Sequence, residues 1–461
     1  MNEGAFDVAG RSVVVVGLAR SGLAAARLLA RRGARVVATD VRVEVDLEPE
    51  VLTLAQQGIT LELGGHRTAS FTGADMVVVS PGVPTSLPEL AAARARNVPV
   101  IGELELAWRY MSGPVAAITG TKGKSTTTAA LGAMLSEAGR DVRVGGNIGA
   151  AASGLVEGAD AGTVFALEVS SFQLELTDTF RPHVAVFLNL SADHLDRHRD
   201  LEEYAAAKGR VFANQTPDDW AVVNADDPLV LAQAREARAR RLALRAAASA
   251  PSHEDSAYLD GDEAILERAG AREVLFTRSS VHLPGLHLTT DLLAAAAAAR
   301  LLDVPRDAIA RAVAGFRGSE HVLEHVAVVG GVAFFNDSKA TNVQAVRSSL
   351  EAFDTPLLPI MGGRYKGGDF ASLADAVAGR AKAVFGIGEA CERIRRDLAP
   401  VVAVICCQSL SEAVSRAHAA ASPGDTVLLA PGCSSFDMFR DYAERGRAFK
   451  AEVARLGRSH G

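Results

Sequence analysis

The sequence contains little cysteine and no long hydrophobic run. Its four cysteines, at positions 391, 406, 407 and 433, do not have the spacing of metal ligands. Cys406 and Cys407 extend the apolar run 401–405 and are predicted to be buried strand thiols, which indicates a reducing cytoplasm. The longest alanine-leucine run, residues 292–299, is far too short to cross a membrane. No basic stretch followed by an apolar one opens the chain, so the sequence shows no signal peptide.

An excess of positive charge is missing as well. The formal net charge is −7, which argues against a nucleic-acid scaffold. A small anionic substrate would therefore have to be bound by local basic residues. A hydrophobic content of 48% with 22% charged residues is that of an ordinary soluble globular protein. The length of 461 residues suggests about three domains. We therefore expect small-molecule substrates, no nucleic-acid or membrane partner, and a monomer.

Apolar segments alternate with amphipathic ones along the chain, which is the pattern of α/β domains with mainly parallel sheets. Ser112-Gly113-Pro114 and Gly315-Phe316-Arg317-Gly318 interrupt this pattern and are predicted domain boundaries, which gives domains at 1–112, 113–316 and 317–461. Residues 246–286 are polar and irregular, and only a few short strands are expected there. A helix is predicted at 21–32, and strands are predicted at 12–17, 35–40, 76–80, 115–118, 163–169, 184–188, 221–223, 333–335, 357–361, 383–386, 401–405 and 426–429.

The segment from Ile118 to Thr126, Ile-Thr-Gly-Thr-Lys-Gly-Lys-Ser-Thr, lies between a predicted buried strand and a predicted helix. Glycines let backbone N–H groups approach phosphates, and the N-terminus of a helix adds partial positive charge. Lys124 is expected to reach the β- and γ-phosphates, and the Ser125 hydroxyl to hold Mg²⁺. The usual motif has a glycine where this chain has Ile118, so a short form remains. Although Gly-Lys-Ser also occurs in ordinary turns, the flanking strand and helix favour a nucleoside triphosphate site. Its expected contacts are Gly120, Thr121, Lys122, Gly123, Lys124, Ser125 and Thr126.

A second glycine-containing turn, Gly17-Leu-Ala-Arg-Ser-Gly22, follows the first predicted strand and opens the first predicted helix. With Asp40 at the end of the next strand, the turn has the pattern of a dinucleotide fingerprint whose middle glycine is alanine. By itself it is compatible with nicotinamide binding, or with a tight turn that binds nothing.

Five segments together resemble one enzyme family, the Mur ligases. Residues 119–126 are similar to the ATP site of the Mur ligases and of the related folylpolyglutamate synthetases. The other four are similar to motifs of the branch that adds D-glutamate, and the resemblance extends from about Val13 to Phe449. These four segments are Gly-Gly-Asn-Ile-Gly at 145–149, Leu-Glu-Val-Ser-Ser-Phe-Gln-Leu-Glu at 167–175, Asn-Asp-Ser-Lys-Ala-Thr-Asn at 336–342 and Pro-Gly-Cys-Ser-Ser-Phe-Asp at 431–437.

The resemblance implies a fold and an activity. The implied fold has a Rossmann-like N-terminal domain, a P-loop ATPase-like central domain and a Rossmann-like C-terminal domain. The implied activity is ATP-dependent addition of D-glutamate to UDP-N-acetylmuramoyl-L-alanine through an acyl phosphate, in cytoplasmic synthesis of peptidoglycan precursors for cell-wall growth and division. The first domain is then expected to bind the uridine diphosphate of the substrate. Its implied contacts are Ala19, Arg20, Ser21, Asp40, Arg42, Ser80, Gly82, Asn147, Ser170 and Gln173.

The resemblance also implies a metal site with two Mg²⁺ ions. From the residues alone, Glu168 at the end of a strand could also cap a helix, and His194 and Lys208 would be solvated side chains. The family assigns the second ion to His194 rather than His198. It assigns carbamylation to Lys208, which requires a neutral amine although a free lysine has a pKa of about 10.4. The implied metal ligands are Ser125, Glu168, His194 and Lys208, and the implied catalytic residues are Lys124, His194 and Lys208.

The last domain is expected to bind the amino acid. Lysines and hydroxyls suit a dicarboxylate, because ammonium groups pair with its anions and hydroxyls fix its orientation. Asp337, in the same motif as two of these residues, is expected to belong to the ATP site, and Tyr442 stands where a phenylalanine is more usual. The implied D-glutamate contacts are Lys339, Thr341, Lys366, Ser435 and Tyr442.

Three positions depart from the family pattern on the adenine side. The family usually shows Gly-x-His-Asn-x-x-Asn, and here Leu288 and Asp291 occupy the two asparagine positions. It also usually shows His-Arg where this chain has His321-Val322. Asp291 is still expected to contact ATP, with affinity lowered by roughly 1–3 kcal/mol per lost charge-assisted bond. Arg317 could supply the missing guanidinium from a shifted position.

The sequence leaves three alternatives open. A different amino-acid-adding Mur ligase or a folylpolyglutamate-type ligase would usually carry Asp-Tyr-Ala-His where this chain has Asn-Asp-Ser-Lys at 336–339. A nicotinamide-dependent oxidoreductase would leave the phosphate loop unexplained. A catalytically impaired nucleotide-binding homologue would agree with the three departures and would bind ATP without substrate-dependent phosphate release.

Overall fold

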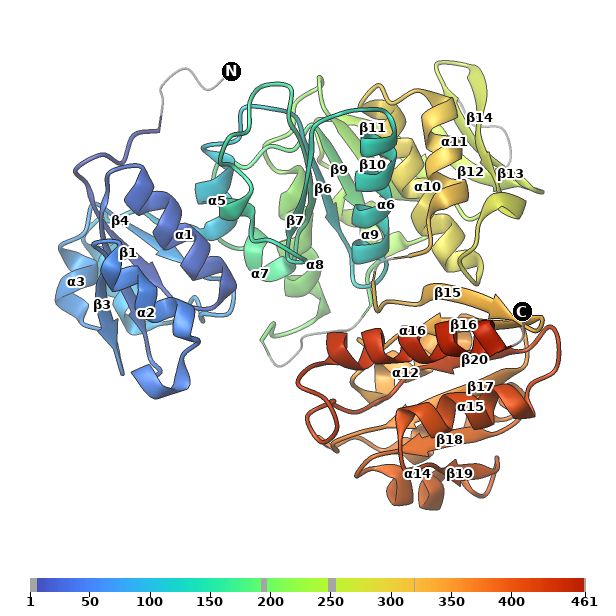
Figure 1. The fold of residues 1–461 in the computed structure, drawn as a ribbon. Coiled ribbons are helices and arrows are strands. Elements are labelled where there is room, and N and C mark those ends of the chain that lie inside the picture. Colours follow the sequence, from blue (N-terminus) through green and yellow to red (C-terminus); the bar gives the residue numbers. More distant parts are fainter. Residues whose placement is uncertain (1–5, 192–196, 248–253, 319, 460–461) are drawn as a thin grey trace. The chain divides into compact units, whose positions relative to one another are not determined.

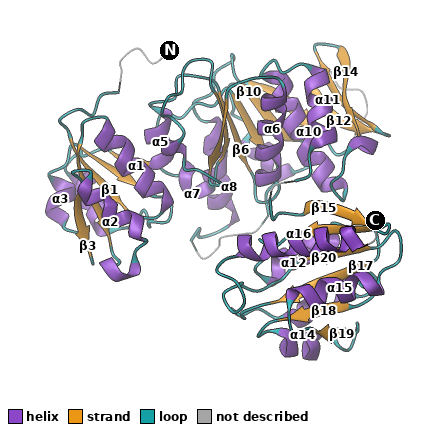
Figure 2. Cartoon of the chain, viewed as in Figure 1, coloured by secondary structure: helices purple, strands orange, loops and turns teal. Residues whose placement is uncertain are grey.

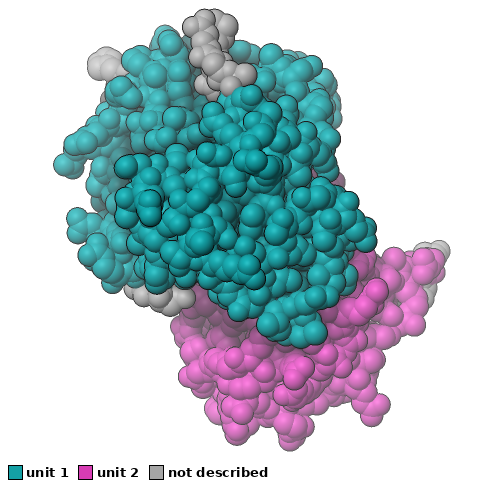
Figure 3. Space-filling view, turned by 90° about the vertical axis from the view of Figure 1, so that its left-hand side faces the viewer, with its two compact units in different colours: residues 1–277, 291–313 teal, residues 278–290, 314–461 magenta. Residues whose placement is uncertain are grey.

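A computed structural model describes residues 6–191, 197–247, 254–318 and 320–459 of the chain. Over these residues the strands form three sheets (Figure 1), and helices accompany each of them (Figure 2). The molecule divides into two compact units, residues 1–277 with 291–313 and residues 278–290 with 314–461 (Figure 3). The first unit contains the first two sheets, and the second unit contains the third sheet.

The first sheet is parallel, with the strand order β3-β2-β1-β4-β5. Its central strand β1 consists mainly of buried valines, as expected for a parallel strand with helices on both faces. The strand order reverses beside β1, so a crevice for a ligand is expected at the carboxyl ends of β1 and β4. The elements are β1 Ser12–Val16, α1 Arg20–Arg31, β2 Arg35–Asp40, α2 Pro49–Gln56, β3 Thr60–Leu63, α3 Thr68–Thr72, β4 Met76–Val79, α4 Pro88–Ala95, β5 Val100–Gly102 and α5 Glu103–Trp108.

The second sheet has the strand order β14-β13-β12-β11-β10-β9-β6-β8-β7. It is parallel from β7 to β12, and β13 and β14 extend it as an antiparallel hairpin. The fully buried strand β6 lies between β8 and β9, so the phosphate loop that follows β6 has two strand ends as neighbours. The strands are β6 Val115–Thr119, β7 Val142–Gly146, β8 Val164–Glu168, β9 Val184–Phe187, β10 Trp220–Asn224, β11 Arg240–Leu244, β12 Ser256–Asp260, β13 Glu263–Arg268 and β14 Ala271–Thr277. The helices are α6 Lys124–Glu137, α7 Ser171–Leu174, α8 Leu201–Gly209, α9 Pro228–Gln233, α10 Leu286–Leu301 and α11 Arg306–Gly315.

The third sheet has the strand order β15-β16-β20-β17-β18-β19. The edge strand β15 is antiparallel to β16, and the other pairs are parallel. Its apolar core contains alternate residues of the central strands, such as Phe334, Leu358 and Leu429, together with Phe449 of the last helix. The elements are β15 Glu324–Val329, β16 Val332–Asn336, α12 Val343–Glu351, β17 Leu357–Gly362, α13 Ala374–Val377, β18 Val384–Ile387, α14 Cys391–Leu398, β19 Val404–Cys406, α15 Leu410–Ala420, β20 Thr426–Leu429 and α16 Tyr442–Ser459.

The predicted α/β fold with mainly parallel sheets is confirmed. Most predicted strands match the observed ones to within one residue at either end, but the strand predicted at 401–405 begins only at Val404. Residues 246–286, which the sequence did not organise, contribute the extension from β12 to β14. The sequence did not predict β3, β5, β7, β11 and β15. The domain boundaries at 112 and 316 stay predictions.

The prediction of two buried strand thiols is wrong for one of the two cysteines. Cys406, the last residue of β19, forms a disulfide with Cys391, the first residue of α14, whereas Cys407 is a buried free thiol. The chain returns from β18 through α14 to β19, which brings the two Cα atoms to 6.0 Å across a sequence separation of 15. Of the helices in the described ranges, none combines the length and apolar character needed to cross a membrane.

Candidate active site

A phosphate loop joins β6 to α6 at the carboxyl edge of the second sheet. Gly123 is the N-cap of α6 and has φ 82°, in the left-handed region that glycine adopts readily. A side chain there would also collide with Asp291, because an ideal Cβ on Gly123 would lie 2.2 Å from Asp291 Oδ1. The N–H groups that begin an α-helix lack partners within the helix, so the N-terminus of α6 suits a phosphate.

Hydrogen bonds from neighbouring segments hold this loop. Lys124 Nζ donates to Thr121 O at 2.9 Å. Lys122 N donates to Asn189 Oδ1 at 2.8 Å, and Asn189 Nδ2 donates back to Lys122 O at 3.0 Å. Asn189 follows β9, and the sequence analysis did not single it out. Its only signal was its place just after a buried strand, and the tertiary structure puts that strand beside β6.

Glu168 lies where a metal ligand is expected. It ends β8, is 2% exposed, and accepts hydrogen bonds from Ser125 Oγ at 2.7 Å and from Asn147 Nδ2 at 2.6 Å. A hydroxyl and a carboxylate side by side are hard oxygen donors of the kind Mg²⁺ prefers, so these two residues fit the ion. The described residues contain no cluster of three or more His, Cys, Asp or Glu side chains that could hold a metal. His194, another predicted metal ligand, lies outside the described residues.

Lys208 is buried, so the interpretation from the residues alone, a solvated side chain, is wrong. Its side chain leaves α8, is 2% exposed, and Nζ donates to Gly120 O of the phosphate loop at 2.7 Å. Nζ also lies 4.7 Å from the centre of the Tyr204 ring. Lys208 therefore contacts the backbone of the phosphate loop. Its carbamylation stays a prediction.

The predicted contacts of the uridine diphosphate, except Ser170, line one pocket of about 580 Å³ in the first unit. Ser170 instead caps α7 in a reciprocal arrangement with Gln173, whose side-chain oxygen accepts from Ser170 N at 2.9 Å. The pocket lies at the carboxyl ends of β1 and β4, as the strand order predicts. The predicted residues in its lining are Ala19, Arg20, Ser21, Asp40, Arg42, Ser80, Gly82, Asn147 and Gln173.

Asp40 is a fixed negative charge in this pocket. Burial by itself would raise its pKa, but the hydrogen bonds from Arg42 and from Leu18 N outweigh burial and lower the pKa to about 2. Arg42 Nη2 donates to Asp40 Oδ2 at 2.8 Å, and Leu18 N donates to the same oxygen at 2.7 Å. Asp40 is therefore ionised at neutral pH, as an acceptor for ribose or base donors would need to be.

Asn147 connects this pocket to the phosphate loop. Arg20 Nη2, from the start of α1, donates to Asn147 O at 2.8 Å. The Asn147 side chain donates to Glu168, which also accepts from Ser125. Asn147 thus contacts a pocket residue with its backbone and the candidate metal ligand with its side chain.

Arg197, which contacts two residues of the pocket lining, is a residue that the sequence analysis missed. Its guanidinium donates to Pro81 O at 2.9 Å and to Val83 O at 3.1 Å, and it lies 4.3 Å from the centre of the Phe172 ring. Pro81 and Val83 line the pocket, and Phe172 belongs to α7, which also carries Gln173. Arg197 therefore ties one pocket wall to α7. The sequence signal for Arg197 was its position in the charged segment 191–198, which the sequence analysis considered only for metal ligands.

The predicted amino-acid contacts of the second unit lie in three loops that follow β16, β17 and β20. These strands are parallel neighbours in the third sheet, so their carboxyl ends share one edge. Gly432 N donates to Ala340 O at 2.8 Å, and Arg364 N donates to Ser434 O at 2.9 Å. The structure thus brings together the loops that carry Lys339 with Thr341, Lys366, and Ser435.

Individual side chains in these loops differ in burial. Ser435 is buried. Lys366 Nζ lies 5.4 Å from the centre of the Phe436 ring. Tyr442, which opens α16, is exposed, and its carbonyl accepts from Ser338 Oγ at 2.7 Å. The loops at this edge therefore carry lysine and hydroxyl groups, which suit a dicarboxylate.

Asp337 is almost fully buried beneath the same edge. Burial raises its pKa to about 6, although hydrogen bonds from Ser349 and from Leu323 N act in the opposite direction. Leu323 N donates to Asp337 Oδ1 at 3.3 Å, and the Ser349 hydroxyl donates to Oδ2. Its predicted contact with ATP stays a prediction.

Arg445 is a second residue that the sequence analysis missed. It is fully buried in α16, and its guanidinium donates to Ser338 Oγ at 3.0 Å, to Ser338 O at 2.9 Å and to Cys433 O at 3.2 Å. Nη1 also lies 3.1 Å from the position of a Cβ on Gly363. Arg445 therefore contacts all three loops from below, and its only sequence signal was an arginine in an amphipathic helix.

Replacing Arg445 with methionine is expected to raise the KM for the amino-acid substrate, which the resemblance implies to be D-glutamate, about tenfold, with a smaller change in the KM for ATP. The substitution leaves buried carbonyls without their donor, which costs roughly 1–3 kcal/mol per group, and releases the three loops. Steady-state kinetics with each substrate varied in turn measures the split. Arg440→Ala, which removes an exposed arginine paired with Glu444, is the control. Equal effects on both KM values would contradict a positioning role.

The first two positions that depart from the family pattern, Leu288 and Asp291, lie in different units of the structure. Leu288 is buried in the second unit, whereas Asp291 is buried in the first unit beside the phosphate loop. Burial raises the pKa of Asp291 to about 8, although the nearby Lys124 ammonium acts to lower it. The carboxyl group is therefore mostly protonated at neutral pH. A neutral carboxylic acid has one donor and one acceptor, as does one edge of the asparagine amide that it replaces.

Asp291→Asn is expected to stabilise the protein increasingly as the pH rises. Between about pH 4 and pH 8 the unfolded carboxyl group loses its proton while the folded one keeps it, so the parent loses stability as pH rises through this window. At pH 8 the loss amounts to roughly 5 kcal/mol, which the amide avoids. Thermal unfolding of both proteins at about pH 5 and about pH 8 measures the difference. Parallel pH profiles would show that Asp291 is not buried in its neutral form.

The third departure, Val322, lies between two residues with left-handed backbone, His321 at φ 65° and Leu323 at φ 42°. Such conformations are uncommon outside glycine and gather at functional sites. His321 is buried, and among the described residues its Nε2 has no hydrogen-bond partner. Arg317 Nη1 donates to Ala314 O at 2.8 Å, so its guanidinium is engaged with its own segment. A contact of Arg317 with ATP stays a prediction.

Three family models match the chain in sequence order. "Mur ligase MurD-like, N-terminal domain" matches residues 11–102, "Mur ligase middle domain" matches 118–299, and "Mur ligase, glutamate ligase domain" matches 323–433.

Curated relatives match over almost the full chain. The chain is 47% identical over 448 residues to UDP-N-acetylmuramoylalanine–D-glutamate ligase from Acidobacterium capsulatum, with 96% of each chain covered. It is 45% identical over 447 residues to the enzyme of the same name from Desulfosudis oleivorans, with 97% of this chain and 96% of the other covered.

Solved structures share the fold at low sequence identity. UDP-N-acetylmuramate-alanine ligase MurC from Thermotoga maritima has a TM-score of 0.57 at 18% identity, with 97% of this chain and 100% of the other covered. A pseudomurein peptide ligase type C from Methanothermus fervidus has a TM-score of 0.55 at 18% identity, with the same coverage.

Proposed function

This chain belongs to the Mur ligase family, and we propose that it joins D-glutamate to UDP-N-acetylmuramoyl-L-alanine with cleavage of ATP to ADP and phosphate. Support comes from the relatives above, which carry this activity in their names at 45–47% identity over nearly their whole length. A cytoplasmic location and a monomeric state stay predictions.

One observation carries the proposal, the position of Asn147 between the pocket and the phosphate loop. Its carbonyl accepts from Arg20 in the pocket, and its amide donates to Glu168 beside Ser125. Asn147 thus links the N-terminus of α1, where a pyrophosphate would bind, to Glu168 beside the phosphate loop. This arrangement suits transfer of the γ-phosphate of ATP to the far end of a UDP-linked molecule.

In the first proposed step the alanyl carboxylate attacks the γ-phosphorus of ATP. The bond from the γ-phosphorus to the bridging oxygen breaks, ADP leaves, and an acyl phosphate forms. Such a transition state needs positioning and charge stabilisation more than covalent chemistry. Lys124 and the N-terminus of α6 provide positive charge at the transferred phosphoryl group, and the backbone of Gly120 and Gly123 allows its close approach.

Ser125 and Glu168 would hold Mg²⁺, and the bound ion would offset the negative charge of the phosphates. Lys208 keeps Gly120 in place through its hydrogen bond to the carbonyl oxygen. A second ion at His194 and carbamylation of Lys208 stay predictions.

In the second proposed step the amine of D-glutamate attacks the acyl carbon. The bond from carbon to the phosphate oxygen breaks, phosphate leaves, and the nitrogen loses a proton to give the amide. Lys339 and Lys366 pair with the carboxylates of the amino acid, and Thr341 and Ser435 offer hydroxyls for its orientation.

A phosphate-release assay with ATP, UDP-N-acetylmuramoyl-L-alanine and a panel of amino acids tests the proposal. We expect release that depends on both the UDP substrate and D-glutamate. Faster release with another amino acid would assign the chain to a different branch of the family. ATP binding without substrate-dependent release would identify a nucleotide-binding homologue without ligase activity.

A further inference from the structure

The disulfide between Cys391 and Cys406 lies at one edge of the third sheet. It joins the first residue of α14 to the last residue of β19, the strand at that edge. Cys391 is 7% exposed, whereas Cys406 is partly exposed and its Sγ lies 3.7 Å from Glu392 Oε1. The bond therefore fixes the start of α14 to the sheet, and Cys406 is its more accessible sulfur.

The segment that leads into α14 contacts two of the predicted amino-acid loops. Gly363 N donates to Ile387 O at 3.1 Å, and Ala390 N donates to Gly363 O at 3.0 Å. Glu389 N donates to Asp437 Oδ2 at 3.1 Å. Gly363 lies three residues before Lys366, and Asp437 lies two residues after Ser435. The position of residues 387–391 therefore bears directly on both loops.

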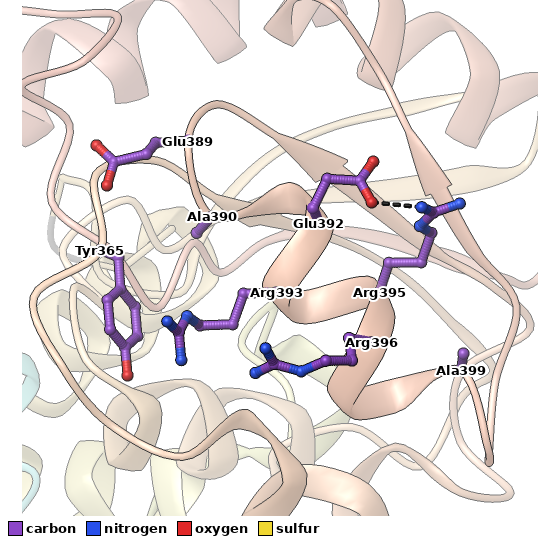
Figure 4. A pocket seen from close by; sticks show the side chains of 8 residues that line it. All are labelled: Tyr365, Glu389, Ala390, Glu392, Arg393, Arg395, Arg396 and Ala399. Atoms are coloured by element: carbon purple, nitrogen blue, oxygen red, sulfur yellow. Dashed lines mark hydrogen bonds and ion pairs between the residues drawn. The ribbon is translucent and has the colours of Figure 1, made fainter.

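The first turns of α14 make a further contact with the loop of Lys366, at a surface pocket of about 770 Å³. The Arg393 guanidinium lies 4.2 Å from the centre of the Tyr365 ring, and Tyr365 precedes Lys366 in the chain. Figure 4 shows Arg393 beside Tyr365, and the ion pair between Glu392 and Arg395 on the same helix. The loop that carries Lys366 therefore contacts α14 itself as well as the segment before it.

We propose that Cys391 and Cys406 form a reversible redox site whose disulfide holds the loops of Lys366 and Ser435 in place for D-glutamate. The inference rests on the proposed function for the identity of the amino acid. The bond itself and its contacts with the two loops do not depend on that identity. In a chain otherwise equipped with buried free thiols, a partly exposed disulfide next to substrate loops has the features of a regulatory bond rather than a structural one.

The chemistry is exchange with a dithiol reductant. A thiolate of the reductant attacks Cys406 Sγ, the Sγ–Sγ bond breaks, and Cys391 leaves as a thiolate that takes up a proton. Cys391 leaves from the N-terminus of α14, where partial positive charge stabilises a thiolate. The second thiol of the reductant then displaces Cys406, so two electrons and two protons pass to the protein and the reductant ends as a disulfide.

The test compares the full-length protein after oxidation and after incubation with dithiothreitol. Alkylation and peptide mass mapping report the state of each cysteine. Steady-state kinetics then gives the KM for D-glutamate and for ATP in both states. We expect reduction to raise the KM for D-glutamate about fivefold, the low end of usual coupling between sites, with little change in the KM for ATP.

Two variants separate this site from the other cysteines. Cys406→Ser is expected to behave as the reduced parent in both conditions, whereas Cys407→Ser, at the adjacent buried thiol, should keep the full redox response. An unchanged KM for D-glutamate on reduction, or free Cys391 and Cys406 after oxidation, would overturn the proposal.

Hydrogen exchange of residues 362–368, compared between the oxidised and the reduced protein, measures the link between the disulfide and this loop without a catalytic assay. Faster exchange after reduction is expected even if the amino-acid substrate is not D-glutamate, so failure of the proposed function remains distinguishable from failure of the redox site. Equal exchange in both states would contradict the link between the disulfide and the loop.

Discussion

Lys124→Ala is expected to lower the rate of ligation by on the order of 10²-fold or more while leaving the fold intact. Lys124 lies at the first position of α6, and its Nζ is held near the loop by a 2.9 Å hydrogen bond to Thr121 O. Its charge matters most when negative charge develops on the transferred phosphoryl group, so the loss should fall mainly on kcat. Phosphate release under saturating substrates measures the effect.

The control for Lys124 is Lys382→Ala. Lys382 pairs with Asp425 in the second unit, and neither residue is assigned to a substrate. We expect the activity of Lys382→Ala to stay within a few-fold of that of the parent. The circular dichroism spectra of the parent and of both variants should be alike. Activity of Lys124→Ala close to that of the parent would remove this residue from the mechanism.

Lys208→Ala is expected to be nearly inactive, for two reasons that an experiment can separate. The unmodified amine donates to Gly120 O at 2.7 Å and so positions the phosphate loop. The carbamate that the family resemblance implies would instead supply an oxygen ligand for Mg²⁺. Lys208 is 2% exposed, so either role would act at a buried position.

Two measurements separate these roles of Lys208. If the carbamate is essential, short carboxylic acids should partly restore Lys208→Ala, and Lys208→Arg should be as inactive as the alanine variant. If the hydrogen bond to Gly120 is what matters, Lys208→Arg should retain activity and added carboxylates should have no effect. Intact mass at high bicarbonate would show the modification directly. Full activity of Lys208→Ala would exclude both roles.

The sequence by itself determined the fold class and the phosphate loop. Strands such as β1, β6 and β8 are continuous apolar runs, because parallel strands are buried on both faces, and this signal is local. The Gly-Lys-Ser turn is also local, since strand, turn and helix N-terminus follow each other within a few residues. The grouping of the pocket residues from Ala19 to Gly82 follows from the same rule, because carboxyl ends of neighbouring parallel strands meet at one edge.

Only the tertiary structure decided the state of individual side chains. The contact of Lys208 with Gly120 joins residues 88 positions apart, and that of Arg445 with Ser338 joins residues 107 positions apart. The burial of Asp291 against Gly123 and the pairing of Cys391 with Cys406 have the same origin. Burial, pKa and disulfide pairing depend on which distant segments pack together, and composition and spacing along the chain do not contain that information. The sequence therefore predicted which segments carry the candidate site. The packing of α8, α14 and α16 on their sheets decided which contacts the side chains of these helices make.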